Sequence, residues 1–270
     1  MLHTSPARNL SEVFNDLFEV RLAESERDRD ISFRLRYQVY CLEQGFEDSS
    51  EFPNERETDV FDRASHHALL CYRPTGSVVG TVRLVLAAGL DSLPLDNLHS
   101  RPRDYMQDVE DCEGRKLAEI SRFCVARSMR RRDGEDRHAD IKWPYNTEKA
   151  ELRRQMPNLS LGLMCAVVLM AREQGVTHLC AAMEHALLVL LKRLGIVFHP
   201  LGPRVDYRGV RQPCHRSLEE ISTEMWVKNL DVWNIVFGEE NDAGRGVVAA
   251  EQQDSAARLD RASHIYERAS

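Results

Sequence analysis

Two β-rich runs joined by a short turn constrain the fold of this chain most. Residues 67–72 and 77–87 are rich in residues that favour strands, and a Pro/Gly turn at 73–76 separates them. This spacing predicts an antiparallel hairpin, which we expect at the centre of the sheet. Residues 116–126 predict a third strong strand that runs into a basic loop.

The second half of the chain alternates between helix and strand patterns. Residues 159–174 predict a helix capped by Asn158 or Ser160, and residues 184–194 predict a helix that Gly195 ends. A strand-rich first half followed by this alternation predicts an α/β (α+β) fold. The other expected elements are strands at 18–23, 177–183 and 196–201, a helix from residue 28, an acidic loop at 44–62, a turn-rich loop at 202–209, and a helix opened by a capping box at 217–220 with 231–237 as its continuation.

The length and composition are typical of an ordinary globular protein. A chain of 270 residues with 43% hydrophobic and 29% charged residues can form one large domain or two small ones. We assign residues 18–238 to one domain, with 1–17 as an N-terminal extension and 239–270 as a mobile tail poor in large apolar residues. The polar, irregular residues 135–158 are expected to form an insertion in that domain.

Charge and cysteine usage argue against several classes of function. A net charge of −7 gives no overall attraction to nucleic acid or to anionic lipid. The seven cysteines are scattered without metal-ligand spacing, which predicts no metal site and reduced thiols in a cytoplasmic protein. The longest apolar run, 159–171, is shorter than the roughly 20 residues of a membrane-spanning helix, so no integral membrane segment is expected.

Seven charged residues fall in or beside segments that otherwise have the composition of a protein core. Burying a charge costs several kcal/mol unless it is paired, so we expect these residues to form ion pairs with one another. Such a network fits either a structural lattice that holds the acidic loop over the sheet or a site for a charged ligand. The residues are Arg36, Glu57, Asp59, Asp62, Arg83, Glu119 and Arg122.

The spacing of Glu119, Ser121 and Arg122 sets a condition on any site that they share. Side chains alternate between the two faces of a strand, so strict alternation would place Arg122 on the face opposite the other two. All three can share a site only if a β-bulge resets the alternation. A common role for these residues therefore predicts a bulge.

The loop that follows this strand contains Arg130, Arg131, Arg132 and Gly134. Backbone amides that turn inward beside basic side chains can bind phosphate groups, such as those of a pantetheine arm or of coenzyme A. Arginine runs are also common on solvated surfaces that bind nothing. Composition leaves both interpretations open.

All seven charged residues lie in four segments whose order and rough spacing resemble those of acyl-homoserine-lactone synthases and related N-acyl amino acid synthases. A closer resemblance, over residues 18–237, is to the acyltransferases associated with PEP-CTERM/exosortase systems. The four segments are RYQVY (36–40), ETDVFD (57–62), GTVRL (80–84) and EISRF (119–123). The closer resemblance rests on YQVYCLEQGF (37–46), the arginines at 130–132, MEHAL (183–187) and VDYRGVRQP (205–213).

These resemblances imply a GNAT fold, in which helices flank a mixed twisted sheet. They imply no permanently bound cofactor, and an acyl carrier protein or coenzyme A thioester as co-substrate, held by the central strand and the loop after it. The positions implied for donor binding are Phe123, Val125, Arg130, Arg131, Arg132 and Gly134.

The resemblance also implies an acceptor site for a small amine such as an amino acid. By position, Arg36, Asp59, Asp62 and Arg83 would bind the acceptor, and Glu119, Ser121 and Arg122 would be catalytic. Phe46 stands where these synthases usually have a tryptophan, which argues against S-adenosylmethionine as the acceptor.

The implied reaction is direct aminolysis of a thioester. It needs a base for the amine proton, which we assign to Glu119, and donors for the oxyanion, which we assign to backbone amides of residues 121–125. Arg83 and Arg122 would hold a carboxylate of the acceptor. Residues 127–154 contain nine Lys or Arg and six Asp or Glu, a local excess of basic residues that suits an acidic acyl carrier protein.

Three functions remain open. The first is an N-acyl amino acid synthase, the second is a quorum-signal synthase that makes an acyl lactone, and the third is an inactive module that binds acyl carriers. The complete charged cluster favours an active enzyme, and the exosortase-type segments favour a linear N-acyl product.

Overall fold

The computed structural model describes residues 10–88, 92–98, 114, 116–126 and 156–238. Their strands are β1 (Phe18–Leu22), β2 (Ser65–Tyr72), β3 (Ser77–Leu86), β4 (Leu117–Val125), β5 (His178–Glu184), β6 (His199–Pro200), β7 (Val205–Asp206) and β8 (Val210–Ser217). They form one sheet in the order β1-β2-β3-β4-β5-β8-β6, with β7 paired to β8. β4 and β5 are parallel, and the other neighbouring strands are antiparallel. The expected mixed α/β fold is therefore confirmed.

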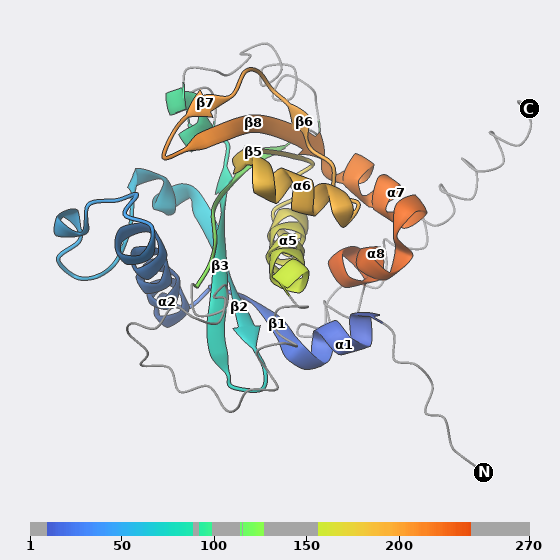
Figure 1. Ribbon diagram of the computed structural model, residues 1–270, viewed down its shortest axis with the longest axis horizontal. Helices are drawn as coiled ribbons and strands as arrows, with labels where there is room; N and C mark the ends of the chain where they lie inside the picture. Colours follow the sequence, from blue (N-terminus) through green and yellow to red (C-terminus); the bar gives the residue numbers. More distant parts are fainter. Residues whose placement is uncertain (1–9, 89–91, 99–113, 115, 127–155, 239–270) are drawn as a thin grey trace, which may run out of the picture. The chain divides into compact units, whose positions relative to one another are not determined.

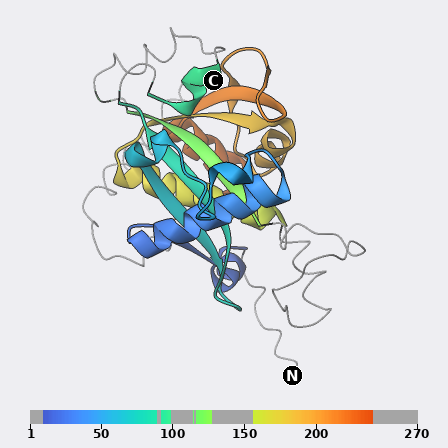
Figure 2. The same ribbon diagram turned by 90° about the vertical axis from the view of Figure 1, so that its left-hand side faces the viewer.

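Helices cover both faces of this sheet. One face carries the long helix α5 with α1 and α8 beside it, and the other carries α2 (Figures 1 and 2). The α-helices are α1 (Leu10–Leu17), α2 (Glu26–Arg36), α5 (Met156–Glu173), α6 (His185–Arg193), α7 (Leu218–Lys228) and α8 (Leu230–Phe237). A π-helix, η1 (Tyr37–Glu43), continues α2, and three short 3-10 helices are η2 (Ser49–Glu51), η3 (Val60–Ala64) and η4 (Pro94–Leu98).

Helix α5 forms the centre of the main core. Its side chains from Leu159 to Ala171 are almost all buried, which explains why the sequence shows an apolar run here rather than a one-sided helical pattern. Gly162 lets α5 lie close to the sheet, because a Cβ atom at this position would be 2.7 Å from Cδ1 of Leu70. None of the helices in the described part of the chain is long and apolar enough to cross a membrane.

The predicted hairpin is confirmed, but its position in the sheet is not. β2 and β3 pair antiparallel, as the turn at 73–76 requires. The centre of the sheet is β4, because β5, β8 and β6 extend the sheet beyond it. The helix at 185–193 and its end at Gly195, where φ is +90°, also follow the prediction.

Several local predictions were wrong. β8 was not predicted, because Pro213 and the charged residues around it lack a strand-like pattern. Asn158 and Ser160 lie inside α5 rather than at its cap. α8 is a separate helix, since the backbone at Asn229 is not helical (φ −157°, ψ 83°). The acidic loop contains η2 and η3, and the strand expected at 196–201 is reduced to His199–Pro200.

Helix α1 lies within the segment predicted as an N-terminal extension. Its Phe14 is buried in the main core, and Leu10 and Leu17 pack against that core at helical spacing. The core therefore begins before residue 18. Residues 1–9, most of the predicted insertion (135–155) and the predicted tail (239–270) lie outside the described residues.

Candidate active site

A β-bulge in β4 is the local feature that forms the site. Arg83 of β3 pairs with Ser121, whereas Thr81 pairs with Cys124, so β4 has one extra residue in this interval. Arg122 lies within the bulge and has a φ of +50°, a left-handed conformation that is uncommon for residues other than glycine. The bulge that a shared site requires is therefore present.

The bulge exchanges the faces to which successive side chains point. Before it, Ile120 packs in the core beneath α5; after it, Phe123 and Val125 pack there, whereas Cys124 packs on the α2 side. Arg122 therefore points to the same face of the sheet as Glu119 and Ser121. This brings the three predicted catalytic side chains to one face.

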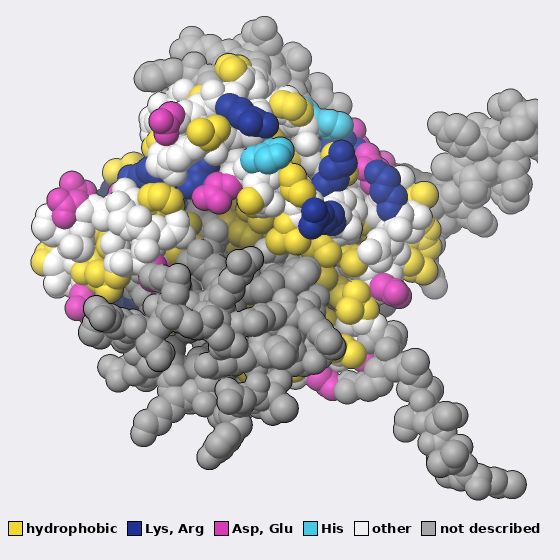
Figure 3. Space-filling view, viewed as in Figure 1, with side chains coloured by type: hydrophobic (Ala, Val, Ile, Leu, Met, Phe, Trp, Pro, Cys, Tyr) yellow, Lys and Arg dark blue, Asp and Glu magenta, His cyan; other side chains and the backbone are white. Residues whose placement is uncertain are grey.

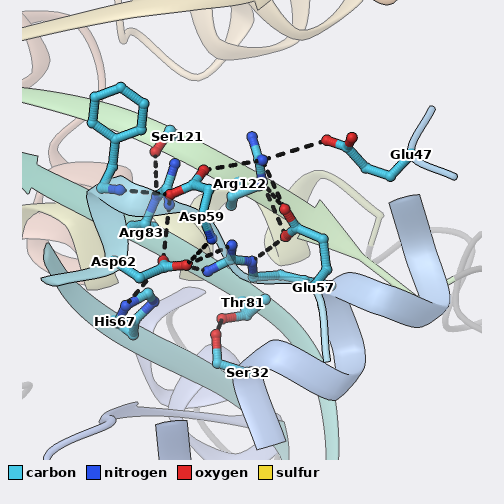
Figure 4. Close-up of polar contacts among 12 residues, drawn as sticks. Ser32, Glu47, Glu57, Asp59, Asp62, His67, Thr81, Arg83, Ser121 and Arg122 are labelled. Carbon is cyan, nitrogen blue, oxygen red and sulfur yellow. Dashed lines mark hydrogen bonds and ion pairs between the residues drawn. The ribbon is translucent and has the colours of Figure 1, made fainter. Parts of the chain in front are cut away.

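Arg36 and Arg83 form a buried ion-pair lattice with the segment at 57–62. Figure 4 shows Arg83 beside Asp59 and Asp62 of this segment. Nε of Arg36 lies 2.5 Å from Glu57, and its Nη1 lies 2.7 Å from Asp62. Nη1 of Arg83 lies 2.6 Å from Asp59 and 2.8 Å from Asp62. These contacts tie α2 and β3 to η3.

Arg122 extends this lattice toward the surface. Its Nη2 lies 2.7 Å from Glu57, 3.2 Å from Asp59 and 3.4 Å from Glu47. Its guanidinium also lies over the ring of Tyr40, 5.3 Å from the ring centroid. Four groups from three segments of the chain therefore fix this side chain.

The lattice controls the ionisation of its members. Burial opposes the charged form of Glu57, but Arg36 and Arg122 outweigh burial and lower its pKa to about 2. The pKa of Asp62 is lowered for the same kind of reason, since Arg36 and Arg83 outweigh its burial. His67, whose Nε2 lies 3.6 Å from Asp62, is neutral because burial and Arg36 lower its pKa to about 3.

β4 and β5 diverge next to the bulge, and a pocket lies between them. Their pairing ends at Ile120 and Ala181, after which β5 continues beside β8. Within the described residues, the edge of β4 from Ser121 to Val125 has no strand beside it on the β5 side. The pocket has a volume of about 280 Å³.

The pocket has a polar end and an apolar wall. Glu119, Ser121 and Arg122 line the polar end, while the wall includes Phe123, Val125, Leu159 and Leu187. A ligand with a polar head and a hydrocarbon chain fits this division. Arg36 and Arg83 are fully buried behind the pocket and do not line it.

Glu119 differs from the other carboxylates of the site. Its side chain is buried, and one oxygen accepts a hydrogen bond of 2.7 Å from the backbone N–H of Leu95 in η4. Burial raises its pKa to about 8, against the opposing effects of this hydrogen bond and of Arg83 and Arg122. A carboxyl group with this pKa can both accept and release a proton near neutral pH.

Ser121 is connected to the lattice through its hydroxyl group. Its Oγ accepts a hydrogen bond of 2.9 Å from Nε of Arg83. Since this oxygen accepts from the guanidinium, its own hydrogen is directed away from Arg83.

The predicted site residues are only partly brought together. Residues 119, 121, 122, 123 and 125 line one pocket, whereas residues 36, 59, 62 and 83 form the lattice behind it. Arg130, Arg131, Arg132 and Gly134 lie outside the described residues. No group of His, Cys, Asp and Glu side chains in the described residues is arranged to hold a metal ion.

Sequence reasoning gave no role to four residues at the pocket or next to it. Tyr40, Arg208 and Arg211 line the pocket, and Glu47 bonds to Arg122 and Arg208. Two of the segments that carry the resemblance to exosortase-associated acyltransferases, 37–46 and 205–213, contain the first three. The resemblance of those segments was therefore the signal in the sequence that pointed to these three residues.

Part of the chain is similar in sequence to a known class of transferase domain. Residues 35–138 match the model of the acetyltransferase (GNAT) domain. The fold is the GNAT-type acyltransferase fold, a mixed open sheet flanked by helices. No protein with a curated description matches the chain in sequence.

Particular solved structures share this fold. An N-acyl amino acid synthase from uncultured soil microbes, FeeM, is 17% identical with a TM-score of 0.52, over 79% of this chain and 97% of that one. The acyl-homoserine-lactone synthase LasI is 17% identical with a TM-score of 0.52, over 87% of this chain and 98% of that one. The CoA-dependent acyl-homoserine lactone synthase BjaI, solved with SAM and isopentyl-CoA, is 21% identical with a TM-score of 0.50, over 80% of this chain and 89% of that one.

The first prediction concerns the buried lattice. Arg36→Leu leaves Glu57 and Asp62 buried without this partner, so the free energy of unfolding should fall by about 3–5 kcal/mol. Urea denaturation measures this change. Arg34→Leu, in the same helix, breaks a half-exposed pair with Asp30 and should cost less than about 1 kcal/mol. Similar losses for both variants would contradict the burial of the Arg36 pairs.

The second prediction concerns the ionisation of Glu119. Its pKa in the folded protein is raised from 4.5 to about 8, so its stabilising contribution is complete below pH 4.5 and is lost as the pH rises through 8. Relative to Glu119→Gln, the wild type should lose up to about 1.4 kcal/mol of stability per pH unit within this range. Urea denaturation of both proteins at several pH values measures the difference. A difference that stays constant would mean that the carboxyl group is ionised throughout.

Proposed function

We propose that this protein is an N-acyltransferase that moves a fatty acyl group from a thioester donor to the amine of an amino acid or a similar small acceptor. The observation that carries the proposal is the pocket between β4 and β5, which combines Glu119 at its polar end with an apolar wall. The match to the acetyltransferase (GNAT) domain and the fold shared with acyl-transferring synthases support it.

The proposed reaction is direct aminolysis, in which the amine nitrogen bonds to the thioester carbonyl carbon. Glu119 accepts the proton that the amine releases, and its pKa of about 8 makes it an effective base near neutral pH. The tetrahedral intermediate then collapses, and the C–S bond breaks. Glu119 returns the proton to the leaving thiolate, so the products are an amide and a thiol.

The edge of β4 is the proposed site of oxyanion stabilisation. Backbone amides between Ser121 and Val125 border the gap between the diverging strands, where a thioester carbonyl would lie. The hydroxyl group of Ser121, oriented by its bond from Arg83, is a further donor in this proposal. Fixed donors of this kind typically contribute a few kcal/mol to catalysis.

In this proposal Arg36, Asp59, Asp62 and Arg83 act on the acceptor indirectly. Arg36 and Arg83 are fully buried and bonded to carboxylates of the protein, which leaves them poorly placed to bind a ligand. They instead position Ser121 and the carboxylates that hold Arg122. We therefore treat these four as positioning residues.

We propose an acyl carrier protein as the donor, with acyl-CoA as the alternative. The local excess of basic residues at 127–154 supports an acidic partner. In the described part, α6 contributes Leu187 to the pocket wall and carries Lys192 and Arg193 in its last turn. Figure 3 shows Lys and Arg side chains gathered over this helix.

The setting of the reaction is also part of the proposal. The resemblance of segments 37–46 and 205–213 supports an association with a PEP-CTERM/exosortase system. The six described cysteines are buried and form no disulfide, which supports a reducing compartment such as the cytoplasm.

A lactone-forming synthase is the second candidate. It is favoured by the TM-scores of 0.52 and 0.50 to two acyl-homoserine-lactone synthases, which equal or approach that of the N-acyl amino acid synthase. Phe46 in place of the usual tryptophan favours the linear product. The product itself separates the two candidates.

The third prediction tests the reaction and its base. Expression in a bacterial host should produce a linear N-acyl amino acid in cell extracts, detected by mass spectrometry. Glu119→Gln should reduce the transfer rate of the purified enzyme by about 10²–10⁴-fold, because general base catalysis contributes this much. Glu51→Gln, an exposed position in η2, is the matched control. A lactone product would support the second candidate, and the absence of any acylated product would support an inactive module. Full activity of Glu119→Gln would refute the assignment of Glu119 as the base.

The fourth prediction tests the donor. If an acidic acyl carrier protein docks on basic residues, its KM should rise as NaCl is raised from low to high concentration, while the KM for acyl-CoA carrying the same chain should change less. Thiol release in a continuous assay measures both. Equal use of the two donors without salt dependence would rule out a docked carrier.

A further inference from the structure

Two arginines at the pocket belong to neither the lattice nor the proposed catalytic group. Arg208 and Arg211 line the pocket from the segment between β7 and β8 and from β8 itself. Together with Arg122 they contribute three guanidinium groups to its lining. The lining also contains two carboxyl groups, those of Glu119 and Glu184. Each of these guanidinium groups has a carboxylate partner in the protein, so an anionic ligand must compete with an existing ion pair.

Contacts within the protein hold these arginines in place. Nη2 of Arg208 lies 2.5 Å from Glu47, a residue 161 positions away in the chain, and its guanidinium lies over the ring of Tyr207. Nη1 of Arg211 lies 2.5 Å from Glu184, and its guanidinium lies over the ring of Phe46. Glu47 engages both terminal nitrogens of Arg208, and the other nitrogens of Arg211 donate to the backbone carbonyls of Tyr207 and Arg208. A ligand carboxylate that binds here therefore replaces an existing partner.

The ion pairs of these two arginines are more exposed to solvent than those of Arg36. The side chain of Glu184 is 52% exposed. Both oxygens of Glu47 contact Arg208, and one of them also lies 3.4 Å from Nη2 of Arg122. Because the side chain of Arg208 is 29% exposed and that of Arg36 is fully buried, a ligand carboxylate can replace Glu47 on Arg208 at a lower cost than it could replace Asp62 on Arg36.

We propose that Arg208 and Arg211 form the subsite for the carboxylate of the acceptor, with Glu47 as the counter-ion that the carboxylate displaces from Arg208. This inference rests on the proposed function and assigns its acceptor to the class of α-amino acids or similar amino carboxylates. It replaces Arg83 in that role, because Arg83 is buried and bonded to Asp59 and Asp62. Arg122, beside Ser121 in the bulge, lines the same pocket as this subsite and Glu119.

Phosphate groups of the donor are another source of anionic charge, so the test must separate acceptor from donor. N-Dodecanoylglycine carries the hydrocarbon chain and the carboxylate of a product without any phosphate. N-Dodecanoylglycinamide is the same molecule without the charge. Their affinities for the full-length protein, measured by titration calorimetry, isolate the contribution of the carboxylate.

The fifth prediction is that the wild type binds the acid at least about tenfold more tightly than the amide, because a charge-assisted bidentate bond contributes more than 1.4 kcal/mol. Arg208→Gln and Arg211→Gln should abolish this preference and leave the affinity for the amide unchanged. Arg204→Gln, an exposed position in the loop before β7, should keep the preference. Glu47→Gln should strengthen binding of the acid, since it removes the competing carboxylate.

Kinetic measurements distinguish the failure of this inference from that of the proposed function. In the subsite proposal, Arg208→Gln raises the KM of the free amino acid and leaves the KM of the thioester unchanged. A rise in the KM of the thioester alone would assign these arginines to donor phosphates and overturn the inference, as would an unchanged preference for the acid. If the wild type transfers no acyl group to any amino acid but still prefers the acid, the proposed function fails and the carboxylate subsite stands.

Discussion

The bulge at Arg122 is the constraint on which the rest of the site depends. One extra residue in β4 reverses the alternation of its side chains between the two faces of the sheet. Arg122 therefore lies on the same face as Glu119 and Ser121, while Phe123 and Val125 point toward α5. Next to it, β4 and β5 separate and expose a strand edge. A single local irregularity thus creates both the polar end and the apolar wall of the pocket.

The ion-pair lattice explains how the strained backbone at Arg122 is maintained. Arg122 has a left-handed backbone conformation, which costs of order 1–3 kcal/mol and persists only when its surroundings hold it in place. Glu57, Asp59 and the ring of Tyr40 provide these contacts. Arg36 and Arg83 in turn fix the carboxylates, and the neutral state of His67 adds no further positive charge. A structural role and a role in the candidate site are therefore compatible for this cluster, because the buried ion pairs of Arg36 and Arg83 support the pocket-facing side chain of Arg122.

The site combines groups with opposite electrostatic environments. Glu57 and Asp62 stay ionised because arginines surround them, whereas Glu119, buried beside η4, has a raised pKa. Such a separation of carboxyl pKa values is typical of sites where one carboxyl group exchanges protons and the others provide fixed charge. Arg208 and Arg211 add positive charge at the pocket from a distant part of the chain.

The sequence by itself determined the fold class, the pairing of β2 with β3 in a hairpin, most helices of the second half and the charged residues that must pair, because periodicity, turn residues and the cost of burying charge are local properties. It also indicated that Glu119, Ser121 and Arg122 could meet only through a bulge. Only the tertiary structure decided which arginines are buried and which face the pocket, since that depends on pairing between segments far apart in the chain. For the same reason β8 and the contact between Glu47 and Arg208 were not predictable: the partners of Pro213-containing β8 and of Glu47 are brought close by the fold.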